Sequence, residues 1–368
     1  MSGARSIALD FWRGIAIALV VLVHVTHGLD LVGAIAEFGE FGKYGVQLFF
    51  ILSGYLMGSI YYDSMCKPDL KSYSNHMTKR FFRVAPMFYL GGLLYTGLYF
   101  GLGPRYSAPD GIGAVDIALT AFFVHWITPT SINSVVPGGW SIAAEMSFYL
   151  ALPLFIAFVR NERVSSAIYI MIFIAISVFC AEVAIKYGLY SEFNSSYPEQ
   201  WESWIKLSFP SQLPVFAMGI LWAHTEKVGL GMSGFRRIVL LVGILCLILS
   251  RNGFFYLTHI FPASILCLAA SGHYSFLNGK HLFVNMVSRL GVVSFSVYII
   301  HFGVIGLSKK MGVFSFFGWS SQYWQLLIFY VFVLLVSYVL SEITYRAVES
   351  RGVAAGRYVW SKIASSFV

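Results

Sequence analysis

The feature that most constrains this chain is the recurrence of apolar runs of about twenty residues along its whole length. A helix of that length crosses a hydrocarbon core of about 30 Å. Only 11% of the 368 residues are charged, whereas soluble domains carry about 25%. The pattern excludes a soluble globular protein. It predicts an all-α, polytopic bundle of membrane helices, because lipid offers no partner to exposed backbone groups.

The apolar runs predict about ten transmembrane helices. A further segment, 113–128, is too short to span comfortably and contains Asp116 and His125, so we interpret it as re-entrant or interfacial. We expect one membrane domain over residues 1–350, which includes this segment, followed by a short basic cytoplasmic tail over 351–368. The predicted spans are 6–28, 43–62, 84–102, 139–159, 165–186, 210–226, 236–251, 254–271, 286–308 and 323–345.

Basic residues between the spans predict the orientation of the chain, because cytoplasmic loops are enriched in lysine and arginine. The pattern fits if both termini are cytoplasmic, and only Lys309 and Lys310 clearly depart from it. The net charge of +8 then reflects topology and contact with anionic lipid, not nucleic acid. The cysteines are scattered without metal-ligand spacing, so no metal is expected. The cytoplasmic loops would hold Lys67, Lys71, Lys79, Arg80, Arg83, Arg160, Arg163, Lys227, Arg236, Arg237, Lys280, Arg289, Arg346, Arg351, Arg357 and Lys362.

The first apolar run, FWRGIAIALVVLVHVTHG, contains an arginine and two histidines. Eleven helical steps separate Arg13 from His24, which places them on one face about 16 Å apart. Asp10 lies three residues before Arg13 and can pair with it. Charged side chains inside a membrane span usually face a polar pathway. The simpler alternative is that Arg13 extends to the membrane interface and that His24 forms a hydrogen bond with a neighbouring helix. A neutral imidazole can take a proton from a hydroxyl, and a fixed cation can hold an anion.

Two further segments carry polar groups that are costly or unusual in a span. In GGWSIAAEMSFY, Ser141, Glu145 and Tyr149 recur every four residues and share a face. An unpaired carboxylate at Glu145 would be costly, so it is expected to be protonated, paired or bound to substrate. In KRFFR, the cations Lys79, Arg80 and Arg83 suit a polyphosphorylated ligand, or serve topology alone.

The remaining candidates are more ambiguous. Gly54 and Gly58 form a G-x-x-x-G pattern that favours helix packing, with Ser53 as a hydroxyl that could line a site. His301 either supports a site from another helix or bonds across helices. His125 has the same two interpretations.

Five segments in the same order resemble the acyltransferase-3 family of integral membrane acyltransferases. They are LDFWRGIAIALVVLVHV with its R-x10-H spacing, GVQLFFILSGYLM, RFFR, GWSIAAEMSFYLALP and SFSVYIIHF. The resemblance implies a ten-span bundle that moves an acyl group, usually acetyl, from cytoplasmic acyl-CoA to a hydroxyl of a carbohydrate or glycolipid at the outer side. Gln47 departs from the family, since an acidic residue is common there. Many relatives also carry a soluble esterase-like domain after the last span, so membrane acyl transfer is expected to be the whole activity here, or a partner completes it.

The resemblance also assigns roles residue by residue. Arg13 and His24 match the family's essential pair, Arg80 and Arg83 its R-x-x-R, and Trp140, Ser141 and Glu145 its W-S-x-x-x-E. The predicted roles are a general base at His24 with Glu145 orienting the acceptor or the imidazole, donor binding by Arg13, Lys79, Arg80 and Arg83, and acceptor or supporting roles for Asp10, Trp140, Ser141, Ser53 and His301.

The prediction is therefore an acyl-CoA-dependent O-acyltransferase of the bacterial inner membrane that acts on a cell-envelope saccharide or glycolipid. Two alternatives remain. One is a proton-coupled or anion transporter that uses the same stripe, although no internal repeat is visible in the sequence. The other is the second large group of membrane-bound O-acyltransferases, which lacks the R-x10-H first helix.

Overall fold

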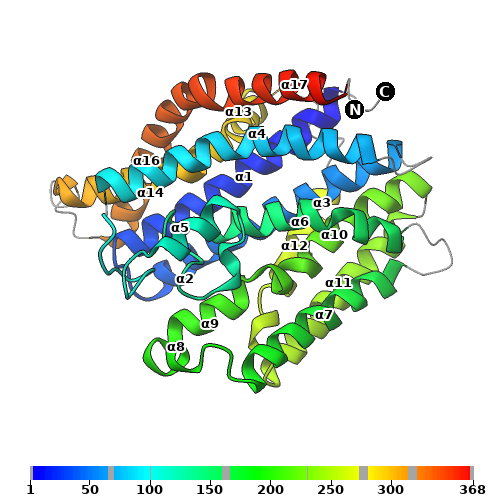
Figure 1. Cartoon of the computed structure of the whole chain (residues 1–368), viewed down its shortest axis with the longest axis horizontal. Coiled ribbons are helices and arrows are strands. Elements are labelled where there is room, and N and C mark those ends of the chain that lie inside the picture. The colour runs from blue at the N-terminus through cyan, green and yellow to red at the C-terminus, as the bar shows by residue number, and fades with distance from the viewer. Residues whose placement is uncertain are drawn as a thin grey trace. The chain divides into compact units, whose positions relative to one another are not determined.

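A computed structural model of the chain describes residues 3–64, 70–99, 101–159, 166–229, 231–272, 281–313 and 321–364. Over these ranges the fold is all-helical, as predicted, and no β-strand occurs in them, only an isolated bridge between Arg105 and Ala108. The chain, whose helices are labelled in Figure 1, divides into two compact units. Unit 1 comprises Met1–Phe49, Thr78–Tyr99 and His273–Val368, and unit 2 comprises Phe50–Met77 and Phe100–Gly272. Lys67, Arg160, Arg163 and Lys280 lie outside the described residues.

Unit 1 is built around α1 (Gly3–Gly28), which packs on α2 (Ala34–Glu40), α13 (Leu282–Val292), α14 (Ser294–Lys310) and α16 (Gln322–Thr344). The remaining elements of the unit are the 3₁₀ turn η1 (Phe41–Tyr44), the start of α3 (Gly45–Ser64), most of α4 (Leu70–Leu94), the π-helical turns η2 (Tyr95–Tyr99) and η5 (Tyr345–Glu349), and α17 (Ser350–Ala364).

Two glycines bring the backbones of α1 and α13 into direct contact. A Cβ atom added at Gly291 would overlap the backbone oxygen of Asp10 and lie 2.9 Å from Gly14 N. A Cβ atom added at Gly14 would overlap Val287 O and lie 2.8 Å from Val287 Cγ1. The two helices can therefore cross at this point only because neither residue has a side chain.

The predicted span 286–308 is not one straight helix, because its residues form two helices that meet at 77°. The break falls at Val293, where α13 ends and α14 begins. The physical reason lies two residues earlier: Gly291 holds α13 against Asp10, whereas α14 follows α1 further along, with Ile305 packed at Gly28. One straight helix could not make both contacts.

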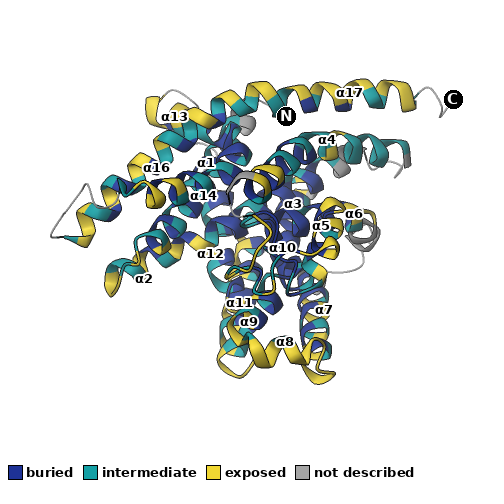
Figure 2. Ribbon diagram, turned by 60° about the vertical axis from the view of Figure 1, so that its left-hand side comes forward, coloured by how far each residue is buried: buried dark blue, intermediate teal, exposed yellow. Residues whose placement is uncertain are grey.

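The predicted tail largely forms a helix, α17, that packs on α4. A Cβ atom at Gly352 would overlap Phe82 O and lie 3.1 Å from Pro86 Cγ, and one at Gly356 would lie 2.8 Å from Phe82 Cβ. These glycines are spaced by four residues and form one small face that approaches α4 closely. The other side of α17, which carries Arg357, is an exposed band (Figure 2).

Unit 2 is a second helical bundle in which α10 packs on α6, α7 and α12. The prediction for Gly54 and Gly58 is confirmed, since both lie against α10. A Cβ atom at Gly54 would overlap Phe216 O, and one at Gly58 would lie 2.9 Å from Ala223 Cβ. The elements are α5 (Ala114–Ala121), η3 (His125–Ile127), α6 (Trp140–Val159), α7 (Ser166–Lys186), α8 (Ser191–Ser196), α9 (Pro198–Leu207), α10 (Phe209–Val228), α11 (Met232–Arg251), η4 (Phe255–Leu257) and α12 (Ile260–Gly272), with the remaining residues of α3 and α4.

The predicted count of about ten spans is not met. Four helices within the described ranges are long and apolar enough to cross a membrane, and five if the bent pair α13 and α14 is one span. The four are Ile7–Gly28, Met232–Arg251, Phe255–Gly272 and Gln322–Ala364.

Most described residues of the other predicted ranges are helical, and two of these helices carry polar or charged residues. α10 carries Gln212, His224 and Glu226, and α4 begins with a basic, polar segment. α3, α6 and α7 each adjoin residues outside the described ranges. Segment 113–128, which was not counted as a span, holds only the eight-residue α5 and the turn η3.

Candidate active site

The imidazoles of His24 and His301 meet in unit 1. His24 is half-buried on α1, and His301 is fully buried on α14. His301 Nε2 lies 3.1 Å from His24 Nδ1, and the ring centroids are 5.0 Å apart. Phe302 covers the His24 ring at a centroid distance of 4.3 Å. This contact is consistent with both interpretations of His301, because it joins two helices and it also reaches the predicted base.

Backbone carbonyls define which nitrogen carries the proton in each neutral ring. His24 Nδ1 lies 2.9 Å from Val20 O, and His301 Nδ1 lies 3.0 Å from Val297 O. A carbonyl only accepts, so both Nδ1 atoms carry the proton. His301 Nε2 then accepts from the His24 Nδ1–H, which is shared with Val20 O. His24 Nε2 is left with a lone pair and takes no hydrogen bond from any described residue.

Arg13 lies on the same face of α1 as His24, because α1 is one uninterrupted helix. Arg13 Nη1 donates to Asp10 Oδ1 at 3.1 Å, which confirms the predicted pair. Ile17 and Val20 lie between Arg13 and His24 on this face, and both are fully buried. The face is therefore packed against protein and does not look into lipid.

The second histidine of the first helix, His27, lies edge-on to His24 with ring centroids 6.3 Å apart, but its own hydrogen-bond partner is elsewhere. The His27 ring is 57% exposed and pairs with Glu40 of α2. At this end of unit 1, Lys309 Nζ pairs with Asp30 Oδ2 at 3.1 Å, so one lysine that departs from the loop charge pattern has an acidic partner.

The R-x-x-R element lies on α4, on the turns that α17 covers. Lys79 is exposed, whereas Arg80 and Arg83 are half-buried. The Arg83 guanidinium interacts electrostatically with Glu349, a buried carboxylate in the π-helical turn that leads into α17. Sequence reasoning missed Glu349, although a glutamate just beyond an apolar run of 23 residues was a visible signal.

The Glu145 carboxylate is held by two hydroxyl groups in unit 2. Ser53 Oγ donates to Glu145 Oε1 at 2.5 Å, and the Tyr149 hydroxyl donates to the same oxygen. The sequence predicted that Glu145 is protonated, paired or bound to substrate, and in the structure the carboxylate is instead held by hydroxyl groups of the protein itself. The structure also brings Ser53 of α3 to it, a pairing that spacing could not show. Glu145 and His24 belong to different units, so the predicted role of Glu145 beside the imidazole stays a prediction.

Three other candidates in unit 2 have local structural roles. Trp140 is buried, with its ring edge-to-face against Phe50 at 5.8 Å. Ser141 Oγ donates to Gly138 O at the start of α6. Burial lowers the pKa of His125 to about 4, so this imidazole is neutral at physiological pH.

The fold and the site define an all-helical membrane protein whose first helix presents an unprotonated imidazole nitrogen, fixed in its tautomer by a second histidine. The sequence profile of the acyltransferase 3 family, described as an acyltransferase domain, matches residues 6–345. The chain belongs to this family.

A curated relative agrees with the family assignment. Acyltransferase MdmB of Streptomyces mycarofaciens is 26% identical over 293 residues, which cover 76% of this chain and 72% of MdmB. No solved structure matches the chain. The family and this relative support membrane acyl transfer as the class of activity.

Proposed function

We propose that the chain transfers an acyl group, acetyl in the simplest case, from cytoplasmic acyl-CoA to a hydroxyl of a cell-envelope saccharide or glycolipid, with His24 as general base. The observation that carries the proposal is the open Nε2 atom of His24, whose lone pair follows from the contacts of Nδ1 with Val20 O and His301. The protein would lie in the bacterial inner membrane with both termini cytoplasmic, as the loop charges predict.

The proposed chemistry balances without a metal or a redox partner. His24 Nε2 takes the proton of the acceptor hydroxyl while its oxygen attacks the thioester carbonyl carbon. The new carbon–oxygen bond forms as the carbon–sulfur bond breaks. The leaving thiolate then takes the proton from Nε2, which returns His24 to its starting state.

The R-x-x-R element would hold the phosphates of the donor. Arginine binds phosphate bidentately, and Arg80 and Arg83 stand with the exposed Lys79 on α4. Arg13 would add positive charge on the same predicted cytoplasmic side. Its partner Asp10 fixes the guanidinium in place.

The proposed activity can be tested in membranes that contain the chain. The membranes are incubated with acetyl-CoA labelled in the acetyl group, and envelope glycans and lipids are analysed by mass spectrometry. Label on a saccharide or glycolipid hydroxyl, absent from membranes without the protein, is expected. Label on protein or phospholipid alone would contradict the proposed acceptor class, and no transfer at all would contradict the donor.

His301 acts in this scheme as a positioning residue. Replacing it by alanine removes one acceptor of the His24 Nδ1–H while Val20 O remains, so kcat should fall about tenfold and the donor KM should stay unchanged. Glutamine, whose side-chain oxygen can accept the same hydrogen, should restore part of the rate. Steady-state kinetics in detergent or nanodiscs measure both effects. Equal losses in the alanine and glutamine variants would contradict the positioning role.

Arg80 and Arg83 should act on the nucleotide part of the donor. Replacing both by glutamine is expected to raise the KM for acetyl-CoA by at least about tenfold, because two charge-assisted contacts are lost. Acetyl-pantetheine has no phosphate, so its KM should not change. The exposed Arg251 at the end of α11 provides a matched control, and Arg251→Gln should leave both constants unchanged. A rise in KM for both donors would indicate a structural role for the pair.

A further inference from the structure

The Tyr95 hydroxyl bonds two backbone groups of the α14 turn that carries His301. It donates to Ile299 O at 2.6 Å, and it accepts from the Gly303 N–H at 2.9 Å. In a regular α-helix these two backbone groups, four residues apart, pair with each other. One buried side chain therefore bridges the turn from residue 299 to residue 303, and His301 lies at the centre of that turn.

A glycine one turn earlier lets α4 approach α14 closely enough for this contact. Gly91 and Tyr95 are four residues apart, so they are neighbours on one face of the helix. A Cβ atom added at Gly91 would lie only 2.6 Å from Ile299 Cγ2. Tyr95, the first residue of η2, follows α4 directly. The close approach therefore lets its hydroxyl reach the backbone of α14.

The bridged turn carries two side chains that contact the predicted base. His301 Nε2 lies 3.1 Å from His24 Nδ1, and the Phe302 ring lies 4.3 Å from the His24 ring. Both side chains leave the backbone between the two groups that Tyr95 holds. A rotation of this turn would therefore move the acceptor of the His24 Nδ1–H and the ring that covers His24 together.

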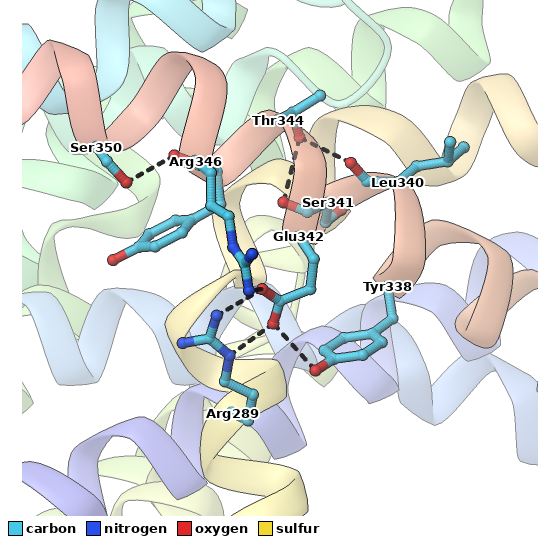
Figure 3. A network of polar contacts seen from close by, with 9 residues as sticks. Arg289, Tyr338, Leu340, Ser341, Glu342, Thr344, Arg346 and Ser350 are labelled. Atoms are coloured by element: carbon cyan, nitrogen blue, oxygen red, sulfur yellow. Dashed lines mark hydrogen bonds and ion pairs between the residues drawn. The ribbon is translucent and has the colours of Figure 1, made fainter.

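The polar network that ties α13 to α16 is too distant to set this turn. Arg289 of α13 donates to the Glu342 carboxylate of α16 at 2.6 and 2.5 Å, and the Tyr338 hydroxyl donates to the same carboxylate at 3.0 Å (Figure 3). Arg289 is twelve residues before His301, and the 77° bend at Val293 separates them. The network thus fixes α13, whereas Tyr95 acts on the turn of α14 itself.

We propose that Tyr95 is a positioning residue for acyl transfer, whose hydroxyl fixes the α14 turn that brings His301 to His24. This inference rests on the proposed function, in which His24 is the base. Tyr95 contacts neither the donor nor the acceptor in this scheme, so its effect passes through His301. A hydroxyl that served only to join two helices would affect stability instead of the rate.

Replacing Tyr95 by phenylalanine removes the hydroxyl and keeps the ring. Ile299 O and the Gly303 N–H can then pair with each other, so Tyr95→Phe should fold and melt close to the unmodified protein. Its kcat should fall about tenfold, as expected for His301→Ala. The donor KM should not change, because Arg83 lies twelve residues before Tyr95, about 18 Å along the helix.

A double variant separates positioning from general damage to the fold. Because Tyr95 acts through His301, the protein with both Tyr95→Phe and His301→Ala should lose about tenfold in kcat, as each single variant does. Tyr338→Phe is the matched control, since it also removes a hydroxyl from unit 1, and it should leave kcat unchanged (Figure 3). An unchanged rate in Tyr95→Phe, multiplied losses in the double variant, an equal loss in the control or loss of the fold would each overturn the proposal.

A readout without substrates distinguishes this proposal from the proposed function. Solid-state NMR of protein labelled with nitrogen-15 histidine reports the ring nitrogens of His24, which are identified by their absence from His24→Ala. Tyr95→Phe and His301→Ala should shift these resonances, whereas Tyr338→Phe should not. Unshifted resonances in Tyr95→Phe would overturn the positioning role. No acyl transfer by the unmodified protein would instead contradict the proposed function, which is a separate result.

Discussion

Replacing His24 by alanine is expected to lower kcat for acyl transfer by about 10²–10⁴-fold, the usual contribution of a positioned general base. The reason is specific to one atom. His24 Nε2 carries the lone pair because Nδ1 donates to Val20 O and His301 Nε2. The donor KM should change little, because the side chain is not among the groups proposed to bind the donor.

His27 provides the matched control for this prediction. It is an imidazole on the same helix, three residues further on, but its ring is exposed and pairs with Glu40. His27→Ala should therefore keep nearly full activity. Size-exclusion profiles and melting temperatures of both variants would establish that the protein is folded. A folded His24→Ala protein with an unchanged rate would remove the base from the mechanism, and a comparable loss in His27→Ala would point to a general effect at this end of α1.

The properties that sequence could predict are those carried by one helix. Spacing alone gave the shared face of Arg13 and His24, the pair of Asp10 with Arg13, and the packing role of Gly54 and Gly58, because helical geometry relates residues up to a few turns apart. The all-helical class followed from composition in the same way.

The contacts that complete the site join residues far apart in the chain. His24 and His301 are 277 residues apart, and Ser296 and Glu349 are 53 apart, so no periodicity relates them. The position of Glu349 also depends on a π-helical turn, which changes the angular position of the residues that follow it. No proline or glycine in this turn indicates it from the sequence. The hydropathy of the sequence does not predict the bend at Val293 either. Both α13 and α14 are apolar, and the cause of the bend is a contact with another helix.

That contact gives the second large effect. Replacing Gly291 by leucine is expected to abolish the folded state of unit 1, because even its Cβ atom would overlap the backbone oxygen of Asp10. Backbone atoms cannot move aside as a flexible side chain can, so α13 would have to leave α1. The shift would displace Asp10 and its partner Arg13 and remove the bend from which α14 carries His301 to His24. Expression of monodisperse protein and its melting temperature would report the loss.

The same unit contains a glycine that should tolerate substitution. A Cβ atom at Gly303 on α14 would meet only the Tyr95 ring and hydroxyl, at 3.5 to 4.0 Å, which is ordinary contact. Gly303→Ala should therefore fold normally and even gain a little stability, since alanine is favoured over glycine inside a helix by about 1 kcal/mol. A Gly291→Leu protein that is monodisperse and melts like the Gly303→Ala protein would show that α1 and α13 do not cross in backbone contact. The positions of His24 and His301 would then need another support.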